Sequence, residues 1–148
     1  MNIRAVAVGL AVIAVAVMLF FVVAEKRRLN VLLSAEAHGN KVLATVTFFN
    51  PTDTDIQLEA SNSLADGISR NVFEITADGE RAAYRGEAKE PMGAKTIPAG
   101  GKFSVTVTLN SAYQLDSGMM YRIRYRADNE GREIRSDWVD VEIPGAQD

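Results

Sequence analysis

An alternation of apolar and polar residues with a period of two constrains this chain more than any other feature. The segment KVLATVTFF, residues 41–49, places Val42, Ala44, Val46 and Phe48 on one side of an extended chain. Similar segments follow at 55–60, 72–76, 95–109, 120–127 and 136–143. This pattern predicts an all-β fold, an immunoglobulin-like antiparallel β-sandwich of seven to eight strands spanning residues 30–143.

Turn-forming residues separate the predicted strands at nearly regular spacing. Asn50-Pro51, Asp78-Gly79 and Pro98-Ala99-Gly100-Gly101 each stand at the end of an alternating segment. Gly accepts a positive φ, and Pro removes a donor from the strand ladder, so both residue types favour turns. The polar, serine-rich stretch 60–66 is expected to cross between sheets, and no helix is expected in residues 30–143.

An apolar N-terminal segment precedes the predicted strands. Residues Ala5–Ala24 carry no charge, and about 20 residues at roughly 1.5 Å each are long enough to span a bilayer core. Two interpretations remain open: an uncleaved transmembrane helix or signal anchor, and a leader cleaved after Ala24. On either view residues 1–4 form an N-terminal tail, 25–29 a linker and 144–148 a C-terminal tail. Because the sequence has no cysteine, a lipid-modified cysteine is excluded.

The last predicted hairpin carries the candidate binding site. If Tyr121 and Ile123 face the core, then Arg122, Arg124 and Arg126 face outward. On the final strand, inward valines turn Trp138 and Asp140 outward as well. The register that satisfies both strands sets Arg122 opposite Asp140 and Arg124 opposite Trp138. The four residues Arg122, Arg124, Arg126 and Trp138 are interpreted either as a solvated sheet face with cross-strand pairs or as a protein-binding patch, since Trp and Arg are enriched at interface hot spots.

The composition limits the chemistry that the chain can perform. The net charge of −3 argues against nucleic acid as a partner, and His38 is the single histidine, placed in a predicted turn. A zinc-peptidase helix needs two histidines one turn apart. The stretch NPTDTD, residues 50–55, is interpreted as a solvated turn or as a cation site, but it lacks the spacing of a calcium loop. We therefore expect a protein that is not an enzyme and that has no cofactor.

Residues 50–125 carry a resemblance to a known family. The matching pieces occur in this order: Asn50-Pro51-Thr52, Leu64-Ala65-Asp66-Gly67, Phe73-Glu74-Ile75, Asp78-Gly79, Tyr84-Arg85-Gly86, Pro98-Ala99-Gly100, Phe103-Ser104-Val105, Leu109, Tyr113-Gln114-Leu115, Gly118 and Tyr121-Arg122-Ile123-Arg124-Tyr125. Together they resemble the N-terminal β-domain, or pro-region, of deuterolysin-type metallopeptidases, the aspzincins. The chain departs from the family where Glu90 follows Lys89 and where two methionines separate Gly118 from Tyr121.

The resemblance implies a non-catalytic module, present without the zinc-binding catalytic domain, that binds or inhibits a protease. An alternative is a single-span accessory subunit of a larger membrane complex, since small residues such as Ala5, Gly9 and Ala16 allow helices to approach closely. Basic residues on both sides of the apolar segment leave its orientation open. The resemblance favours a single-pass protein of the bacterial inner membrane, with its β-domain in the periplasm or outside the cell.

Overall fold

The computed structural model describes residues 28–146. The predicted membrane-spanning segment 5–24 and the tail 1–4 therefore lie outside the described residues, as do residues 25–27 of the predicted linker. Within the described part of the chain, no helix has the length and apolar character needed to cross a bilayer.

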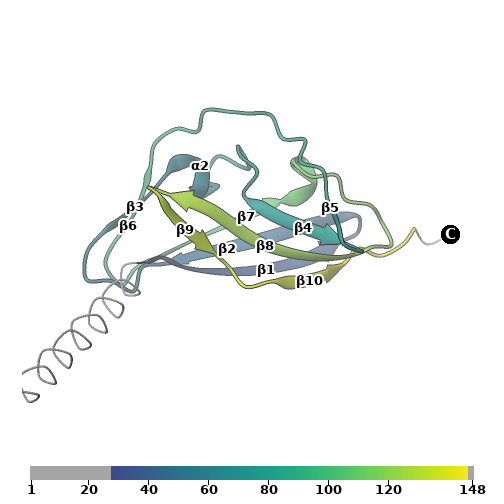
Figure 1. Cartoon of the computed structure of the whole chain (residues 1–148), viewed down its shortest axis with the longest axis horizontal. Helices are drawn as coiled ribbons and strands as arrows, with labels where there is room; N and C mark the ends of the chain where they lie inside the picture. The colour runs from purple at the N-terminus through teal and green to yellow at the C-terminus, as the bar shows by residue number, and fades with distance from the viewer. Residues whose placement is uncertain (1–27, 147–148) are drawn as a thin grey trace, which may run out of the picture.

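The described residues form ten strands, all paired antiparallel, which confirms the predicted all-β class (Figure 1). One sheet has the order β1 (Asn30–His38), β2 (Lys41–Phe49), β7 (Lys102–Thr108). A second has the order β10 (Val139–Glu142), β8 (Met120–Asn129), β4 (Phe73–Ala77), β5 (Glu80–Arg81), with β9 (Arg132–Arg135) also paired to β8. The short strands β3 (Ile56–Leu58) and β6 (Lys95–Ile97) pair with each other.

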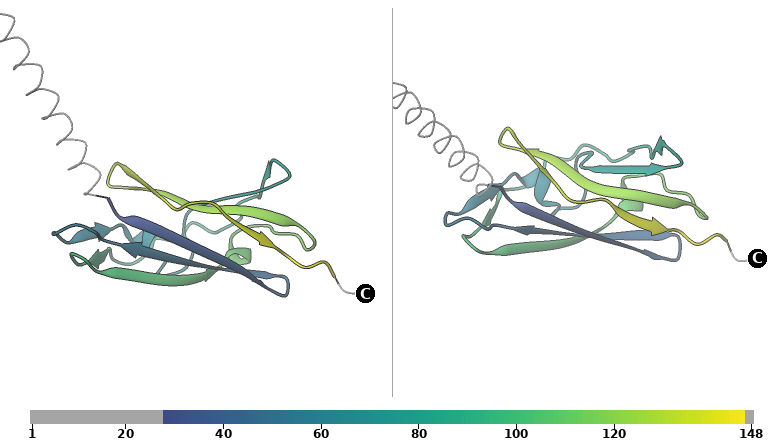
Figure 2. Two further views of the ribbon diagram at one scale, coloured as in Figure 1. Left: turned by 90° about the horizontal axis from the view of Figure 1, so that it is seen from below. Right: turned by 60° about the horizontal axis from the view of Figure 1, so that its bottom comes forward.

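The two larger sheets lie in separate layers, as the turned views in Figure 2 show. The inward residues of β2 predicted from the alternation, Val42, Ala44, Val46 and Phe48, are all fully buried. The ring of Phe48 meets the edge of Tyr125 on β8, with ring centroids 5.4 Å apart, so this aromatic contact joins the layers.

The strand count differs from the sequence-based expectation. Seven to eight strands were expected and the described residues form ten; β5 and β9, which lie outside the predicted segments, have two and four residues. The strand β1 begins at Asn30, the residue at which the predicted β-domain begins. Phe103 on β7 packs against the core and is half-buried.

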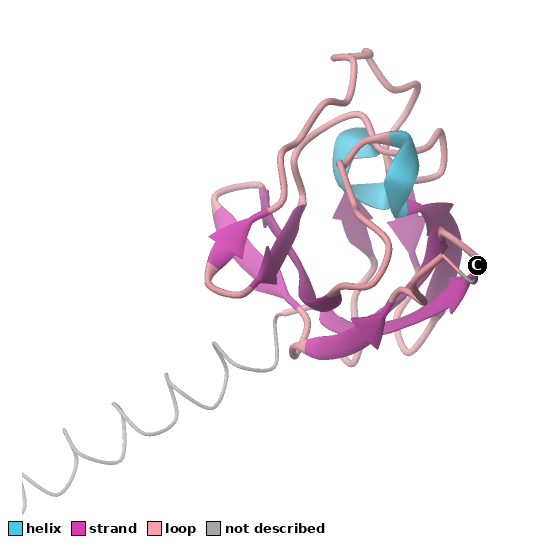
Figure 3. Cartoon of the chain, turned by 90° about the vertical axis from the view of Figure 1, so that its right-hand side faces the viewer, coloured by secondary structure: helices cyan, strands magenta, loops and turns pink. Residues whose placement is uncertain are grey.

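The serine-rich stretch contains a short helix, α2 (Ala60–Ser63), where none was expected. It connects strands of two different sheets, as expected, but its polar residues Ser61, Asn62 and Ser63 are buried. Burial is possible because Asn62 Nδ2 donates to the Asp128 carbonyl at 2.6 Å and the Tyr125 hydroxyl donates to the Asn62 carbonyl at 2.9 Å. Apart from the 3-10 turn η1 (Leu109–Ser111), the rest of the described chain is strands and loops (Figure 3).

Two of the turns that carried the family resemblance are joined by one buried side chain. Asn50 donates from Nδ2 to the carbonyls of Thr54 and Ile97, at 2.8 and 2.9 Å. Its Oδ1 accepts from the Thr52 backbone N–H at 3.0 Å, and its backbone exchanges hydrogen bonds with Gly100 and Gly101. The pieces Asn50-Pro51-Thr52 and Pro98-Ala99-Gly100 thus have a structural role, holding the end of β2 against the start of β7.

Candidate functional site

The candidate residues on β8 occupy the outer surface of the five-stranded sheet, which we call the charged face. It is defined by five arginines and three carboxylates: Arg81, Arg122, Arg124, Arg126, Arg135, Glu74, Glu133 and Asp140, together with Trp138. The predicted register is confirmed for Arg122, which lies opposite Asp140. The Arg122 Nε lies 3.2 Å from the Asp140 carboxylate, and both side chains are well exposed.

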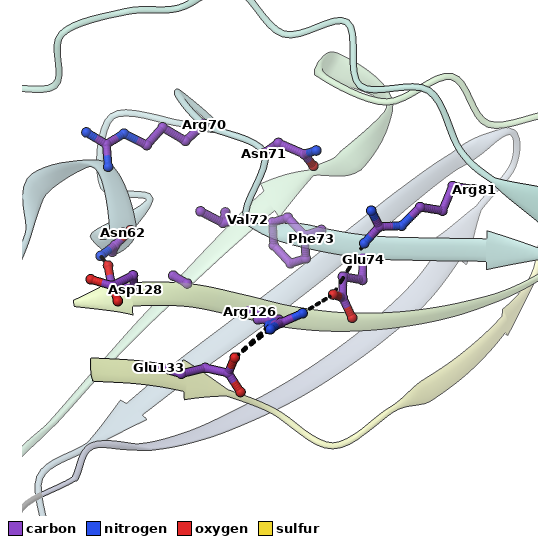
Figure 4. A pocket seen from close by; sticks show the side chains of 11 residues that line it. Asn62, Arg70, Asn71, Val72, Phe73, Glu74, Arg81, Arg126, Asp128 and Glu133 are labelled. Atoms are coloured by element: carbon purple, nitrogen blue, oxygen red, sulfur yellow. Dashed lines mark hydrogen bonds and ion pairs between the residues drawn. The ribbon is translucent and has the colours of Figure 1, made fainter. Parts of the chain in front are cut away.

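Glu74 on β4 is the centre of this face, and the sequence analysis missed it. Its carboxylate accepts a hydrogen bond from Arg124 Nε through Oε2 and one of 2.8 Å from Arg126 Nη1 through Oε1. Arg81 on β5 approaches the same Oε1 at 3.3 Å (Figure 4). Side-chain exposure is 13% for Glu74 and 19% for Arg124, so this ion pair is largely removed from water. Three arginines on two different strands are therefore fixed by one carboxylate.

Arg126 extends the network from β8 to β9. Its guanidinium contacts Glu74 on one side and Glu133 Oε2 on the other, at 2.7 Å from Nη2 and 2.8 Å from Nε. Arg135 lies 3.5 Å from the second oxygen of Glu133. The chain of charges therefore runs across β5, β4, β8 and β9. Glu74 and Glu133 each have more than one arginine neighbour.

The network changes the pKa of two of its members. Burial alone would raise the pKa of Glu74, but hydrogen bonds from Arg124 and Arg126 and their positive charges outweigh it, so its pKa falls below the ordinary value. Hydrogen bonds to Glu74 and Glu133 raise the pKa of Arg126. Both shifts favour the ionised forms, so the pairs are charged at neutral pH.

Trp138 lies at the margin of this network, just before β10. The Arg124 guanidinium carbon is 4.5 Å from the centroid of the indole ring and that of Arg122 is 5.7 Å away. These distances are within the range of cation–π contacts. Trp138 retains 37% exposure, so much of the ring is accessible. The structure thus brings together Arg122, Arg124 and Trp138 as the sequence predicted, with Arg126 bound to Glu74 and Glu133 instead.

Charge is distributed unevenly over the charged face. Its centre carries five arginines against three carboxylates, whereas the whole chain has a net charge of −3. Three further acidic residues of the sheet lie at its periphery: Asp128 and Glu142 at opposite ends of β8, and Glu80 on the edge strand β5. The positive surplus is therefore confined to the middle, beside Trp138.

An open pocket of ≈ 490 Å³ adjoins the network between α2, β4 and β8 (Figure 4). Its charged lining consists of three arginines and three carboxylates: Arg70, Arg81, Arg126, Glu74, Asp128 and Glu133. The pocket has cationic and anionic walls in equal measure, so it suits a polar segment of mixed charge better than a simple anion.

The other candidate positions lie apart from the charged face. His38 is exposed at the end of β1, with Nε2 3.0 Å from the Glu36 carboxylate. In the stretch 50–55, Asp55 Oδ1 accepts the Ala99 backbone N–H at 3.1 Å, so this carboxylate serves the turn. Within residues 28–146 no group of three or more His, Asp or Glu side chains is placed so that it could hold a metal ion.

Comparisons with known proteins find similarity at the level of structure and none at the level of sequence family. No protein-family model and no curated protein matches the sequence. Among solved structures, a "putative lipoprotein (ycdA)" from Bacillus subtilis is similar over 77% of this chain, with 11% sequence identity and a TM-score of 0.36. The matched region spans 34% of that protein, about a third of its length.

Proposed function

We propose that this chain is a non-catalytic binding module whose charged face recognises another protein. In this proposal the two facing sheets form an immunoglobulin-like β-sandwich, and residues 5–24 anchor it in the bacterial inner membrane with the β-domain outside the cytoplasm. The observation that carries the proposal is Trp138, a large aromatic residue left partly exposed between two arginines. Trp and Arg at the centre of a surface are the residue types that contribute most to protein–protein affinity.

The rigidity of the charged face supports the same proposal. Ordering a long side chain on binding costs roughly 0.5–1.5 kcal/mol. Arg124 is already held by Glu74 below and by the Trp138 ring beside it, so much of that cost has been met before a partner arrives. Arg122 pairs with an exposed carboxylate, Asp140, and can exchange that partner for one on another protein.

The partner is proposed to be acidic where it meets the middle of the face, because arginines outnumber carboxylates there. A secreted metallopeptidase fits the family resemblance of residues 50–125. The alternative partner is a set of membrane-complex subunits, to which this chain would be an accessory subunit. Both occupants would use the same surface, so the identity of the captured protein decides between them.

The test is affinity purification of the full-length protein from native membranes in mild detergent, with Trp138→Ala as the test variant. The matched control is Leu32→Ala, because Leu32 is 65% exposed and lies on the other sheet. We expect the amount of copurifying partner to fall at least tenfold with Trp138→Ala and to be unchanged with Leu32→Ala. Equal recovery with both variants, or capture of no protein by the wild type, would contradict the proposal.

A further inference from the structure

The edges of the two larger sheets are protected to different degrees. The outer side of β1 is packed against β10, and β5 is only two residues long. β7 is seven residues long, and among residues 28–146 it pairs with β2 alone. It contains no proline, and its register with β2 has no bulge across residues 102–108. Such an edge offers a row of backbone groups to another strand.

Hydrogen bonds at both ends of β2 show which backbone groups of β7 point outward. Asn50 N–H donates to the Gly101 carbonyl at 2.9 Å and Val42 N–H donates to Asn110 Oδ1 at 2.7 Å. Even-numbered residues of β2 therefore direct their N–H groups toward β7. Their partners on β7 are Phe103, Val105 and Val107, which lie opposite Phe48, Val46 and Ala44 respectively.

The alternate residues of β7, Lys102, Ser104 and Thr106, must consequently turn N–H and C=O away from β2. All three residues are exposed, and no backbone hydrogen bond within residues 28–146 joins them to another segment along that edge. At the last position the Thr108 carbonyl does have a partner, the Ser111 hydroxyl at 2.7 Å.

The inward side chains of β7 also show the missing neighbour. Val46 and Phe48 on β2 are completely buried, whereas Val105 and Phe103, directly opposite them, are only half-buried. The burial of inward side chains in this sheet therefore decreases from β2 to the neighbouring strand β7. The Lys95 ammonium on β6 lies 4.7 Å from the centroid of the Phe103 ring and covers part of it. An additional strand beside β7 would cover the remaining apolar surface of Phe103 and Val105 and would also satisfy the free backbone groups.

We propose that β7 pairs antiparallel with β7 of a second copy of this chain, about a two-fold axis at Val105. This surface is distinct from the charged face and does not depend on its function. The register is self-complementary: full overlap of residues 102–108 places Ser104 opposite Thr106 of the second copy. Both of these residues direct their backbone N–H and C=O away from β2. The register with full overlap is therefore also one in which these groups can hydrogen-bond to the second copy.

The side chains fit this register on both surfaces of the sheet. On the outer surface, Ser104 and Thr106 would extend the hydroxyl pairs that already join β2 and β7, Thr47 with Ser104 at 2.7 Å and Thr45 with Thr106 at 2.8 Å. On the inner surface, Phe103 would meet the smaller Val107 of the second copy, and the two Val105 side chains would meet at the axis. Lys102 faces the uncharged Thr108 of the second copy, so no like charges oppose each other.

Single cysteines test the contact directly, because the sequence has none of its own. At the axis the two Val105 residues would form a non-hydrogen-bonded pair with Cα atoms about 4.5 Å apart, within disulfide range. Two Ser104 residues would be roughly 9 Å apart on the diagonal, outside that range. We expect mild oxidation of the full-length protein in detergent to convert most of Val105→Cys, and little of Ser104→Cys, to a covalent dimer.

A mixture of Ser104→Cys and Thr106→Cys proteins provides the positive counterpart, since these two positions lie opposite each other across the axis. We expect the mixture to cross-link at least fivefold more than either protein alone. Val105→Cys that cross-links no better than Leu32→Cys, placed on the exposed surface of β1, would overturn the proposal. So would cross-linking of β7 to a different protein in native membranes.

Charge substitutions test the register without a covalent bond. Ser104→Lys with Thr106→Lys sets lysines opposite lysines at both positions, whereas Ser104→Lys with Thr106→Asp sets each lysine opposite an aspartate. Both double variants replace the same exposed side chains, and melting curves check that both fold. We expect light scattering to show at least a tenfold weaker dimer for the first variant and a retained dimer for the second. A monomeric wild type, or equal loss in both variants, would exclude this pairing.

Discussion

The two outer surfaces of this molecule are built on the same strand geometry but use opposite chemistry. The charged face joins four strands through Glu74, Glu133 and their arginines. The outer surface of the three-stranded sheet, which we call the hydroxyl face, joins β2 and β7 through two pairs of hydroxyls, Thr45 with Thr106 and Thr47 with Ser104. One surface concentrates its interactions on a single carboxylate, and the other distributes them over independent pairs.

This difference determines what each surface can do. The charged face is fixed, pH-dependent and rich in residues that bind proteins, but a partner must displace water from its charges. The hydroxyl face is uncharged in its middle, so a neighbouring strand can approach its edge without desolvating ions. We therefore expect mutations of the charged face to have large and unequal effects, and those of the hydroxyl face to have small ones.

Glu74→Gln is expected to have the largest effect. Removing one partner of a largely buried ion pair leaves Arg124 uncompensated, which costs roughly 3 kcal/mol of unfolding free energy. The measurement is chemical denaturation of the full-length protein at pH 7. Glu36→Gln is the matched control, because Glu36 is an exposed carboxylate on β1, and it should change stability by less than about 0.5 kcal/mol. Similar losses for both variants would remove the distinction between the two surfaces.

The pH dependence of stability should show the same distinction. Because folding lowers the pKa of Glu74 below its ordinary value of 4.5, the unfolded chain binds a proton more readily between those two values. The contribution of Glu74 is then fully present above pH 4.5 and is lost as the pH falls through the lowered pKa. We expect the stability difference between wild type and Glu74→Gln to shrink below pH 4.5. A difference that stays constant from pH 7 to pH 2 would contradict this assignment.

Trp138→Ala should have an intermediate effect on stability. The contact of its ring with Arg124 is worth about 1 kcal/mol at a partly exposed site. Thermal denaturation measures the loss, and Trp138→Phe, which keeps an aromatic face, should recover part of it. A loss as large as that of Glu74→Gln would mean that the indole belongs to the core, and the proposed binding face would then lose its exposed aromatic residue.

The arrangement within the last hairpin was predictable from sequence, whereas the centre of the charged face was not. Alternation on β8 and β10 fixes which residues face outward, and one register satisfies both strands, so Arg122 opposite Asp140 followed directly. Glu74 lies 50 positions before Arg124, and nothing local shows that β4 pairs with β8. The available signal was a single acidic residue between two buried ones, Phe73 and Ile75.

The short helix α2 was missed for a related reason. Serine and asparagine usually indicate an exposed loop, but in α2 they are buried. Ser63 bonds to the nearby Ala60 carbonyl, whereas Asn62 is satisfied by partners distant in sequence. Asn62 bonds to Asp128, which is 66 positions later in the chain. Local patterns therefore predicted the strands and their faces, while contacts between distant strands decided which polar residues are buried and which arginines share a carboxylate.

The smallest effect is expected from the double substitution Thr45→Val with Thr106→Val on the hydroxyl face. Valine has nearly the shape of threonine and favours strands, and removing both partners of a hydrogen bond leaves no polar group unsatisfied. The free energy of unfolding should change by less than about 0.5 kcal/mol, measured by denaturation alongside Glu74→Gln. Thr45→Val alone should cost slightly more than the pair, because the Thr106 hydroxyl then loses its partner. If the double variant lost as much stability as Glu74→Gln, the hydroxyl pairs would be coupled through the sheet, and the contrast between a central carboxylate and independent pairs would fail.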